Sequence, residues 1–160
     1  MTKVARFKPE HQPQVKALIS RIMDQEFGDA VGAYPTDDLI QPEASYGALG
    51  EAFFVALDGG IVIGTAAIKK EDARVALLRR LFVSPDFRGK KIGTKLIDAA
   101  LVFCRDVGYE EVIFKTTSRM TGANTICQKS GFTQRARLNL GAIELLKFSL
   151  SLLSPAAQKK

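Results

Sequence analysis

The stretch Leu81-Phe82-Val83-Ser84-Pro85-Asp86-Phe87-Arg88-Gly89-Lys90-Lys91-Ile92-Gly93-Thr94 decides the fold, because it joins a strand to a long helix. Residues 75–83 read as a strand that Ser84-Pro85 ends. Apolar residues then recur on one helical face until Gly108, which is a typical helix-ending residue. A strand that leads directly into a helix is the connection expected of an α/β domain.

The same stretch predicts an anion site. The first amide groups of a helix have no partner within it, and the helix dipole favours negative charge there. Gly89 and Gly93 allow a ligand to approach the backbone, and three cations, Arg88, Lys90 and Lys91, add charge. The loop is neither a P-loop nor a dinucleotide-binding GxGxxG loop, because both glycine patterns are absent.

Working outward, the remaining elements follow from periodicity and turn residues. An amphipathic helix follows Pro13, and Asp58-Gly59-Gly60 marks a hairpin turn, whereas residues 28–50 show no clear pattern. The sequence therefore predicts a single α/β domain (α+β) with a mixed, mostly antiparallel twisted sheet flanked by helices. The expected strands are 3–8, 52–57, 61–68, 75–83 and 112–116, with two more runs within 132–152, and the expected helices are about 13–23, 92–107 and 119–130.

Length and composition exclude several classes of protein. A chain of 160 residues that is 46% hydrophobic fits one globular domain. No apolar run is long enough for a membrane span, and two distant cysteines suit neither a disulfide scaffold nor a CxxC pair, so a cytoplasmic protein is expected. One histidine, His11, expected at an exposed helix entry, argues against a multi-histidine metal site. No metal is predicted.

The charge is concentrated in one segment. Residues 69–95 hold nine bases and three acids, which is the whole net charge of +6, whereas residues 22–68 hold eight acids and no base. Two solvated faces would explain this pattern. The alternative is a protein that binds an anion at one site and a cation at another.

Residues 81–93 closely resemble the acetyl-CoA-binding motif of the GCN5-related N-acetyltransferases (GNAT), which is Arg or Gln, two residues, Gly, one residue, then Gly or Ala. Gly108-Tyr109, Ser118 to Ala123 and Lys129-Ser130-Gly131-Phe132 resemble the family's second motif in order and spacing. The resemblance covers residues 3–150. It implies an N-acetyltransferase domain over 1–153, with a frayed tail over 154–160.

The resemblance also implies a cofactor site. Acetyl-CoA is the expected co-substrate, its pantetheine arm pairing with a strand edge and its pyrophosphate bound by the loop. The residues that would bind it are Leu81, Phe82, Val83, Arg88, Gly89, Lys90, Lys91, Ile92, Gly93 and Thr94.

Two departures from the family pattern concern the chemistry. Lys91 stands where the motif has its first glycine, so its side chain either crowds the pyrophosphate or contacts it. Cys127 stands five residues before Phe132, where many relatives carry a tyrosine that protonates the leaving thiolate. Cys127 is therefore the candidate catalytic acid, with a buried packing role as the alternative. No residue is selected as the general base.

The predicted function is transfer of acetyl to a primary amine. The run of acids in 22–68 predicts a cationic small molecule or peptide as acceptor. A CoA-binding regulatory module without turnover is the alternative, because the usual acid and base are missing. Nucleic-acid binding is not expected, since the bases form one compact cluster without stacking aromatic residues. The oligomeric state is left open, with a homodimer as one alternative.

Overall fold

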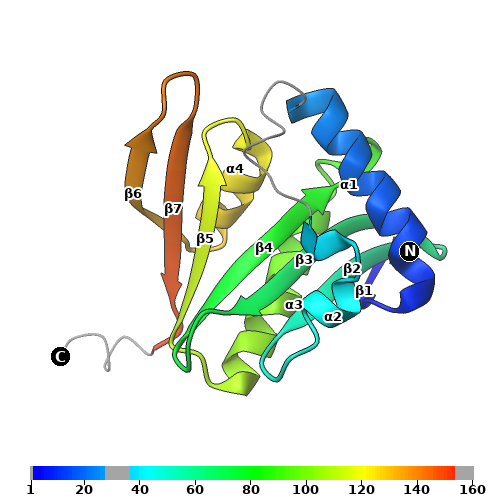
Figure 1. Ribbon diagram of the computed structural model, residues 1–160, viewed down its shortest axis with the longest axis horizontal. Coiled ribbons are helices and arrows are strands. Elements are labelled where there is room, and N and C mark those ends of the chain that lie inside the picture. Colours follow the sequence, from blue (N-terminus) through cyan, green and yellow to red (C-terminus); the bar gives the residue numbers. More distant parts are fainter. Residues whose placement is uncertain (1, 28–36, 154–160) are drawn as a thin grey trace.

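A seven-stranded sheet with the order β1-β2-β3-β4-β5-β7-β6 runs through the computed structural model, which describes residues 2–27 and 37–153 (Figure 1). Neighbouring strands are antiparallel except β4 and β5, which are parallel. The strands are β1 Thr2–Arg6, β2 Ala52–Asp58, β3 Ile61–Lys70, β4 Val75–Val83, β5 Glu111–Thr117, β6 Thr133–Asn139 and β7 Glu144–Ser151. The predicted fold class is confirmed.

Helices cover both faces of the sheet. The longer ones are α1 Gln12–Phe27, α3 Ile92–Val107 and α4 Thr121–Lys129; the shorter ones are η1 Pro9–His11, η3 Asp37–Leu39, α2 Pro42–Ser45 and η4 Pro85–Phe87. Helix α3 joins β4 to its parallel neighbour β5, which is the crossover that a parallel pair requires. None of the helices in the described residues is long and apolar enough to cross a bilayer.

The sheet separates two hydrophobic cores. One lies under α3 and α4 and contains Leu96, Phe114 and Phe148; the other lies under α1 and contains Ile19, Phe53 and Phe82. Because successive side chains of a strand point to opposite faces, Leu81 and Val83 enter the first core while Phe82 enters the second. The end of β4 is thus held firmly from both sides.

Most predicted elements are found within a few residues of their expected ends. The stretch without a clear pattern contains short helical turns at Asp37–Leu39 and Pro42–Ser45. The predicted tail, 154–160, lies outside the described residues.

Candidate functional site

Strands β4 and β5 separate where the candidate site begins. They pair in parallel only from Val75 with Glu111 to Leu78 with Phe114. Beyond Leu78, β4 keeps its partner β3, with Thr65 opposite Phe82 and Gly64 opposite Val83. The edge of residues 81–83 that faces β5 is therefore free for pairing, and the opening is visible between the two arrows in Figure 1.

A bulge in the β3–β4 ladder marks this separation. The register shifts between Thr65 and Ala67, and Arg80 adopts a left-handed conformation with φ of 53°. The Thr65 hydroxyl donates a hydrogen bond of 2.7 Å to the Arg80 carbonyl oxygen. An extra residue in one strand increases the local bend, which turns the end of β4 away from β5.

The Arg80 side chain is buried in an ionic cluster that the sequence analysis missed. Its guanidinium makes two hydrogen bonds to the carboxylate of Asp38, one of them from Nε at 2.9 Å, and the Tyr46 hydroxyl also donates to Asp38. The paired side chains of Arg80 and Asp38 are only 7% and 12% exposed. Burial by itself would raise the pKa of Asp38, but the hydrogen bonds from Arg80 and Tyr46 outweigh it and lower that pKa. An arginine within an apolar strand was the available signal; its partner lies in the stretch without a pattern.

The loop between β4 and α3 has backbone amides without acceptors among the described residues. Lys91 lies immediately before α3 and adopts a left-handed conformation, with φ of 64° and ψ of 22°. The first helical hydrogen bond runs from the Lys95 amide to the Lys91 carbonyl at 3.1 Å. Within the described part of the chain, the amides of residues 89–94 find no acceptor. Unpaired amides at the start of a 16-residue helix form a site for an anion.

The three cations of the loop make different contacts. Arg88 makes a two-pronged ion pair with Glu26 of α1, with distances of 2.9 and 2.8 Å, and its Nε donates to the Val83 carbonyl oxygen. Arg88 therefore fastens the end of β4 to α1. Lys90 and Lys91 are exposed, and the Lys90 ammonium lies 5.2 Å from the centre of the Phe87 ring. They are the charges that remain near the free amides.

A cavity of about 180 Å³ lies between the end of β4 and the start of α4. The predicted residues Leu81, Phe82, Val83 and Arg88 line it, together with Glu26 and the start of α4. Met120 and Thr121 close it on the α4 side. The fold thus brings the predicted strand edge and Arg88 to one hollow, whereas the other predicted loop residues, 89–94, are not among those that line it.

Gly93 has a structural role that differs from the one expected. It is buried, and a β-carbon at Gly93 would lie 2.6 Å from Cδ1 of Ile126 and 3.5 Å from Cγ2 of Val83. A side chain there would therefore meet α4. Gly89, with φ of 80° and nothing within 4 Å of a β-carbon, is the glycine that lies open to a ligand.

Cys127 lies in the core of the protein. Its side chain is 0% exposed and belongs to the core under α3 and α4. It is not among the residues that line the cavity, and burial raises the pKa of its thiol to about 12. This position favours the packing alternative. Tyr109 is likewise buried, with its hydroxyl donating a 2.7 Å hydrogen bond to the Gly50 carbonyl oxygen.

Known proteins similar to this chain share its sequence pattern and its fold. The model of the acetyltransferase (GNAT) family matches residues 17–132. The chain is 30% identical over 122 residues to N-acetyltransferase 8 of Rattus norvegicus, an alignment that covers 73% of this chain and 50% of the rat protein. The chain thus spans about half the length of curated relatives that it matches.

Solved structures extend the likeness to the whole fold. An acetyltransferase of the GNAT family from Staphylococcus aureus Mu50 superimposes with a TM-score of 0.85 at 20% identity, covering 96% of this chain and 100% of that one. A protein from Salmonella typhimurium, solved with its cofactor acetyl-CoA, gives a TM-score of 0.79 at 17% identity, covering 97% and 96% of the two chains. At these identities the likeness is one of fold.

Proposed function

Because this chain belongs to the acetyltransferase (GNAT) family, we propose that it is an enzyme that transfers an acetyl group from acetyl-CoA to a primary amine. One observation carries the proposal: the free β4 edge leads directly to the unpaired amides before α3, so that an extended arm and its phosphates would be bound by consecutive residues. The curated relatives are named N-acetyltransferases, which supports the reaction class.

Each part of acetyl-CoA is assigned to a different set of residues in the proposed site. The N–H and C=O groups on the free edge of residues 81–83, other than the Val83 carbonyl that Arg88 already bonds, pair with the pantetheine arm. The amides of 89–94 bind the pyrophosphate with help from Lys90, Lys91 and the Thr94 hydroxyl. The acetyl group enters the cavity beside Phe82 and Met120. Two reactants held together in this way react as if in one molecule, which removes much of the entropic barrier.

The proposed chemical step transfers acetyl directly from sulfur to nitrogen, with no change of oxidation state. The amine nitrogen attacks the thioester carbonyl carbon, the C–N bond forms, and the C–S bond breaks to release CoA thiolate. The nitrogen loses one proton and the thiolate gains one. The sequence offers the Cys127 thiol as the acid for that thiolate. Its burial and raised pKa support the packing alternative instead.

The charge of the acceptor is a separate part of the proposal. The sequence predicts a cationic amine from the eight acids in residues 22–68. Three of these acids are paired with cations from 69–95 in the fold: Glu26 with Arg88, Asp38 with Arg80, and Glu51 with Lys69. Asp29 lies outside the described residues. Fewer free carboxylates therefore remain to attract a cationic acceptor than the sequence suggests.

We also propose that residues 1–153 act as one catalytic domain and that it works in the cytoplasm. Both cysteines are free and buried, which suits a reducing compartment.

An acetyl-CoA turnover assay over a panel of amines, with calorimetry of CoA binding, tests the reaction. Release of CoA thiol that depends on an amine supports the transferase. Binding of CoA without thiol release from any amine would support the regulatory module instead.

The variant Lys90→Glu/Lys91→Glu tests the loop. We expect acetyl-CoA to bind about tenfold more weakly or worse, because a lost hydrogen bond to a charged group costs roughly 1.5–3 kcal/mol. The control Lys16→Glu changes an exposed lysine of α1 and should leave the affinity unchanged. Equal affinities for both variants would remove the loop from the CoA site.

A further inference from the structure

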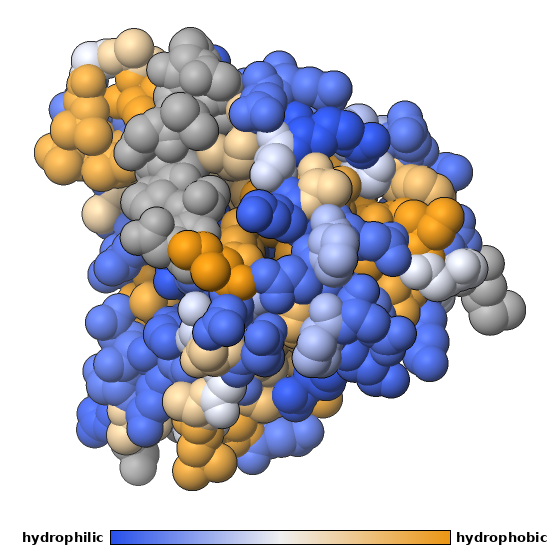
Figure 2. Space-filling model, turned by 45° about the vertical axis from the view of Figure 1, so that its right-hand side comes forward, coloured by the Kyte–Doolittle hydropathy of each residue, from blue (hydrophilic) through white to orange (hydrophobic). Residues whose placement is uncertain are grey.

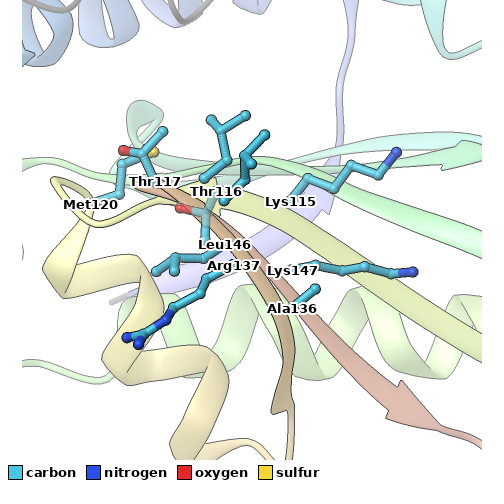
Figure 3. Close-up of a pocket in the computed structure, with 10 residues that line it drawn as sticks. Lys115, Thr116, Thr117, Met120, Ala136, Arg137, Leu146 and Lys147 are labelled. Atoms are coloured by element: carbon cyan, nitrogen blue, oxygen red, sulfur yellow. The ribbon is translucent and has the colours of Figure 1, made fainter. Parts of the chain in front are cut away.

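A second cavity, of about 370 Å³, lies on the half of the sheet that α1 does not cover. Helix α1 packs on one face over the early strands. Within the described residues, no helix packs on that face over β5, β7 and β6. Figure 3 shows the residues that line this groove: Lys115, Thr116, Thr117, Met120, Ala136, Arg137, Leu138, Leu145, Leu146 and Lys147.

Strand alternation places the groove on the α1 side of the sheet. Phe114 and Phe148 enter the core under α3 and α4, so their neighbours Lys115 and Lys147 point to the other face. Met120 packs against the core under α1 and lines both this groove and the cavity between β4 and α4. The groove therefore opens beside the place proposed for the acetyl group.

Two lysines face each other in the groove. Lys115 and Lys147 are directly opposite across the antiparallel β5–β7 ladder, and Figure 3 shows both amino groups extending towards the same end. Like charges in this position destabilise a sheet. Neither lysine is paired with a carboxylate of the described residues. Glu111 shares their face, but it lies four residues along β5, roughly 13 Å from Lys115.

The other charged groups nearby are engaged elsewhere. Arg137 also lines the groove, and its Nε pairs with Glu144 at 3.7 Å. Arg135 donates from Nε to the Ser149 hydroxyl. The lysine pair is thus a site of positive charge that makes no ion pair within the described residues, although Lys147 lines a neighbouring cavity together with Glu110 and Glu111. An anion bound between the two ammonium groups would relieve their repulsion.

The opposite end of the groove is apolar. Leu138 and Leu145 are cross-strand partners and are 57% and 38% exposed. In Figure 2, hydrophobic residues gather at the upper left of the molecule, where the β6–β7 hairpin lies. Thr117 lies two residues from Lys115 along β5, and Leu145 lies two residues from Lys147 along β7. Each step separates the two Cα atoms by roughly 7 Å.

From this arrangement we propose that the acceptor is an amine with an apolar body and an anionic group, a carboxylate in the simplest case. The anionic group binds between Lys115 and Lys147, the apolar body lies on Leu138 and Leu145, and the amine reaches the acetyl group past Met120. This inference rests on the proposed acetyl transfer, and it gives the acceptor the opposite charge to the one that the acid run in the sequence predicts.

A matched pair of acceptors provides the first test. 8-Aminooctanoate and 1,8-diaminooctane have the same apolar chain and reacting amine, and differ in the charge of the far end. We expect kcat/KM to be about tenfold higher for 8-aminooctanoate, and the double variant Lys115→Gln/Lys147→Gln to abolish that preference. The control Lys16→Gln, which changes an exposed lysine of α1 outside the groove, should keep it. A wild-type preference for the diamine, or an amino-acid preference that survives in the double variant, would overturn the proposal.

Binding of octanoate in the presence of CoA separates this inference from the proposed reaction, because octanoate has no amine to acetylate. By calorimetry we expect it to bind the wild-type protein and to bind the double variant about tenfold more weakly. If no amine turns over yet octanoate binds in this way, the proposed reaction fails and the anion site stands. If octanoate does not bind, or binds both proteins equally, the inference fails whatever the turnover.

A second copy of the chain could also cover the leucines. Sedimentation velocity decides this: a dimer that excludes octanoate and that dissociates on Leu138→Lys would show that the groove is an interface, which overturns the acceptor proposal.

Discussion

At the scale of single residues, Lys91 shows why the family motif has a glycine at this position. The backbone there is left-handed, which costs a residue with a β-carbon roughly 1–2 kcal/mol relative to its ordinary conformation. We expect Lys91→Gly to raise the melting temperature by about 2 °C, since part of that cost is offset by the greater freedom of glycine in the unfolded chain. Thermal unfolding followed by circular dichroism measures this.

Lys90→Gly is the matched control for that prediction. Lys90 is adjacent and also exposed, but it is not among the residues with positive φ. Glycine there should lower the melting temperature. The same two variants, measured for CoA affinity, decide whether the Lys91 side chain crowds the pyrophosphate or contacts it.

Cys127 is the residue for which sequence and structure suggest different roles. Because its side chain is fully buried in the core, we expect Cys127→Ala to lower stability by about 1 kcal/mol and to leave kcat within twofold of the wild type. A catalytic acid would instead show a fall of roughly 10²–10⁴-fold in kcat. Steady-state kinetics and thermal unfolding of the same variant distinguish the two, and a large loss of kcat in a stable variant would restore the thiol as the acid.

At the scale of elements, the bulge in β4 joins fold and function. Arg80 combines a left-handed backbone with a buried ion pair to Asp38, and the residues that follow it line the candidate site. Asp38 lies in η3, so the pair connects a segment far away in sequence to the point where β4 turns from β5. We infer that Arg80 positions residues 81–83 without touching either substrate.

Two substitutions at Arg80 separate its backbone role from its charge. Arg80→Ala and Arg80→Gly both remove the arginine partner of Asp38, which costs several kcal/mol. Glycine adopts a φ of 53° without strain, whereas the β-carbon of alanine costs roughly 1–2 kcal/mol in that conformation. In the background Asp38→Asn, which removes the unpaired charge, we expect KM for acetyl-CoA to rise severalfold more for alanine than for glycine, with similar kcat. Identical KM values for the two variants would show that the bulge does not position the cofactor edge.

At the scale of the whole molecule, folding rearranges the charge that appears segregated along the chain. Ion pairs from α1, η3 and the residue before β2 to the basic segment neutralise part of both blocks. Lys90 and Lys91 before α3 and the Lys115–Lys147 pair across β5 and β7 take no part in these ion pairs and lie near the candidate sites. Both sets of lysines flank the opening between β4 and β5, one on the proposed cofactor side and the other on the proposed acceptor side.

Features that depend on residues close together along the chain could be predicted from the sequence. The order and type of the elements, the family, and the loop before α3 were all predictable, because periodicity, turn residues and helix-start amides are local properties. The mixed, mostly antiparallel character of the sheet was also predictable, since a hairpin turn makes neighbouring strands antiparallel and a helix crossover makes them parallel.

Contacts between side chains that are distant in sequence became known only from the tertiary structure. His11 was expected to be exposed, yet it is 8% exposed and its Nδ1 accepts a hydrogen bond from the Lys8 amide. The burial of Cys127, the partner of Arg80 and the opposition of Lys115 and Lys147 likewise depend on strand register and on helix packing. These bring together residues far apart in sequence, 42 positions in the pair of Arg80 and Asp38 and 62 positions in the pair of Arg88 and Glu26. Register and packing are set by the fit between distant segments, which no window of sequence contains.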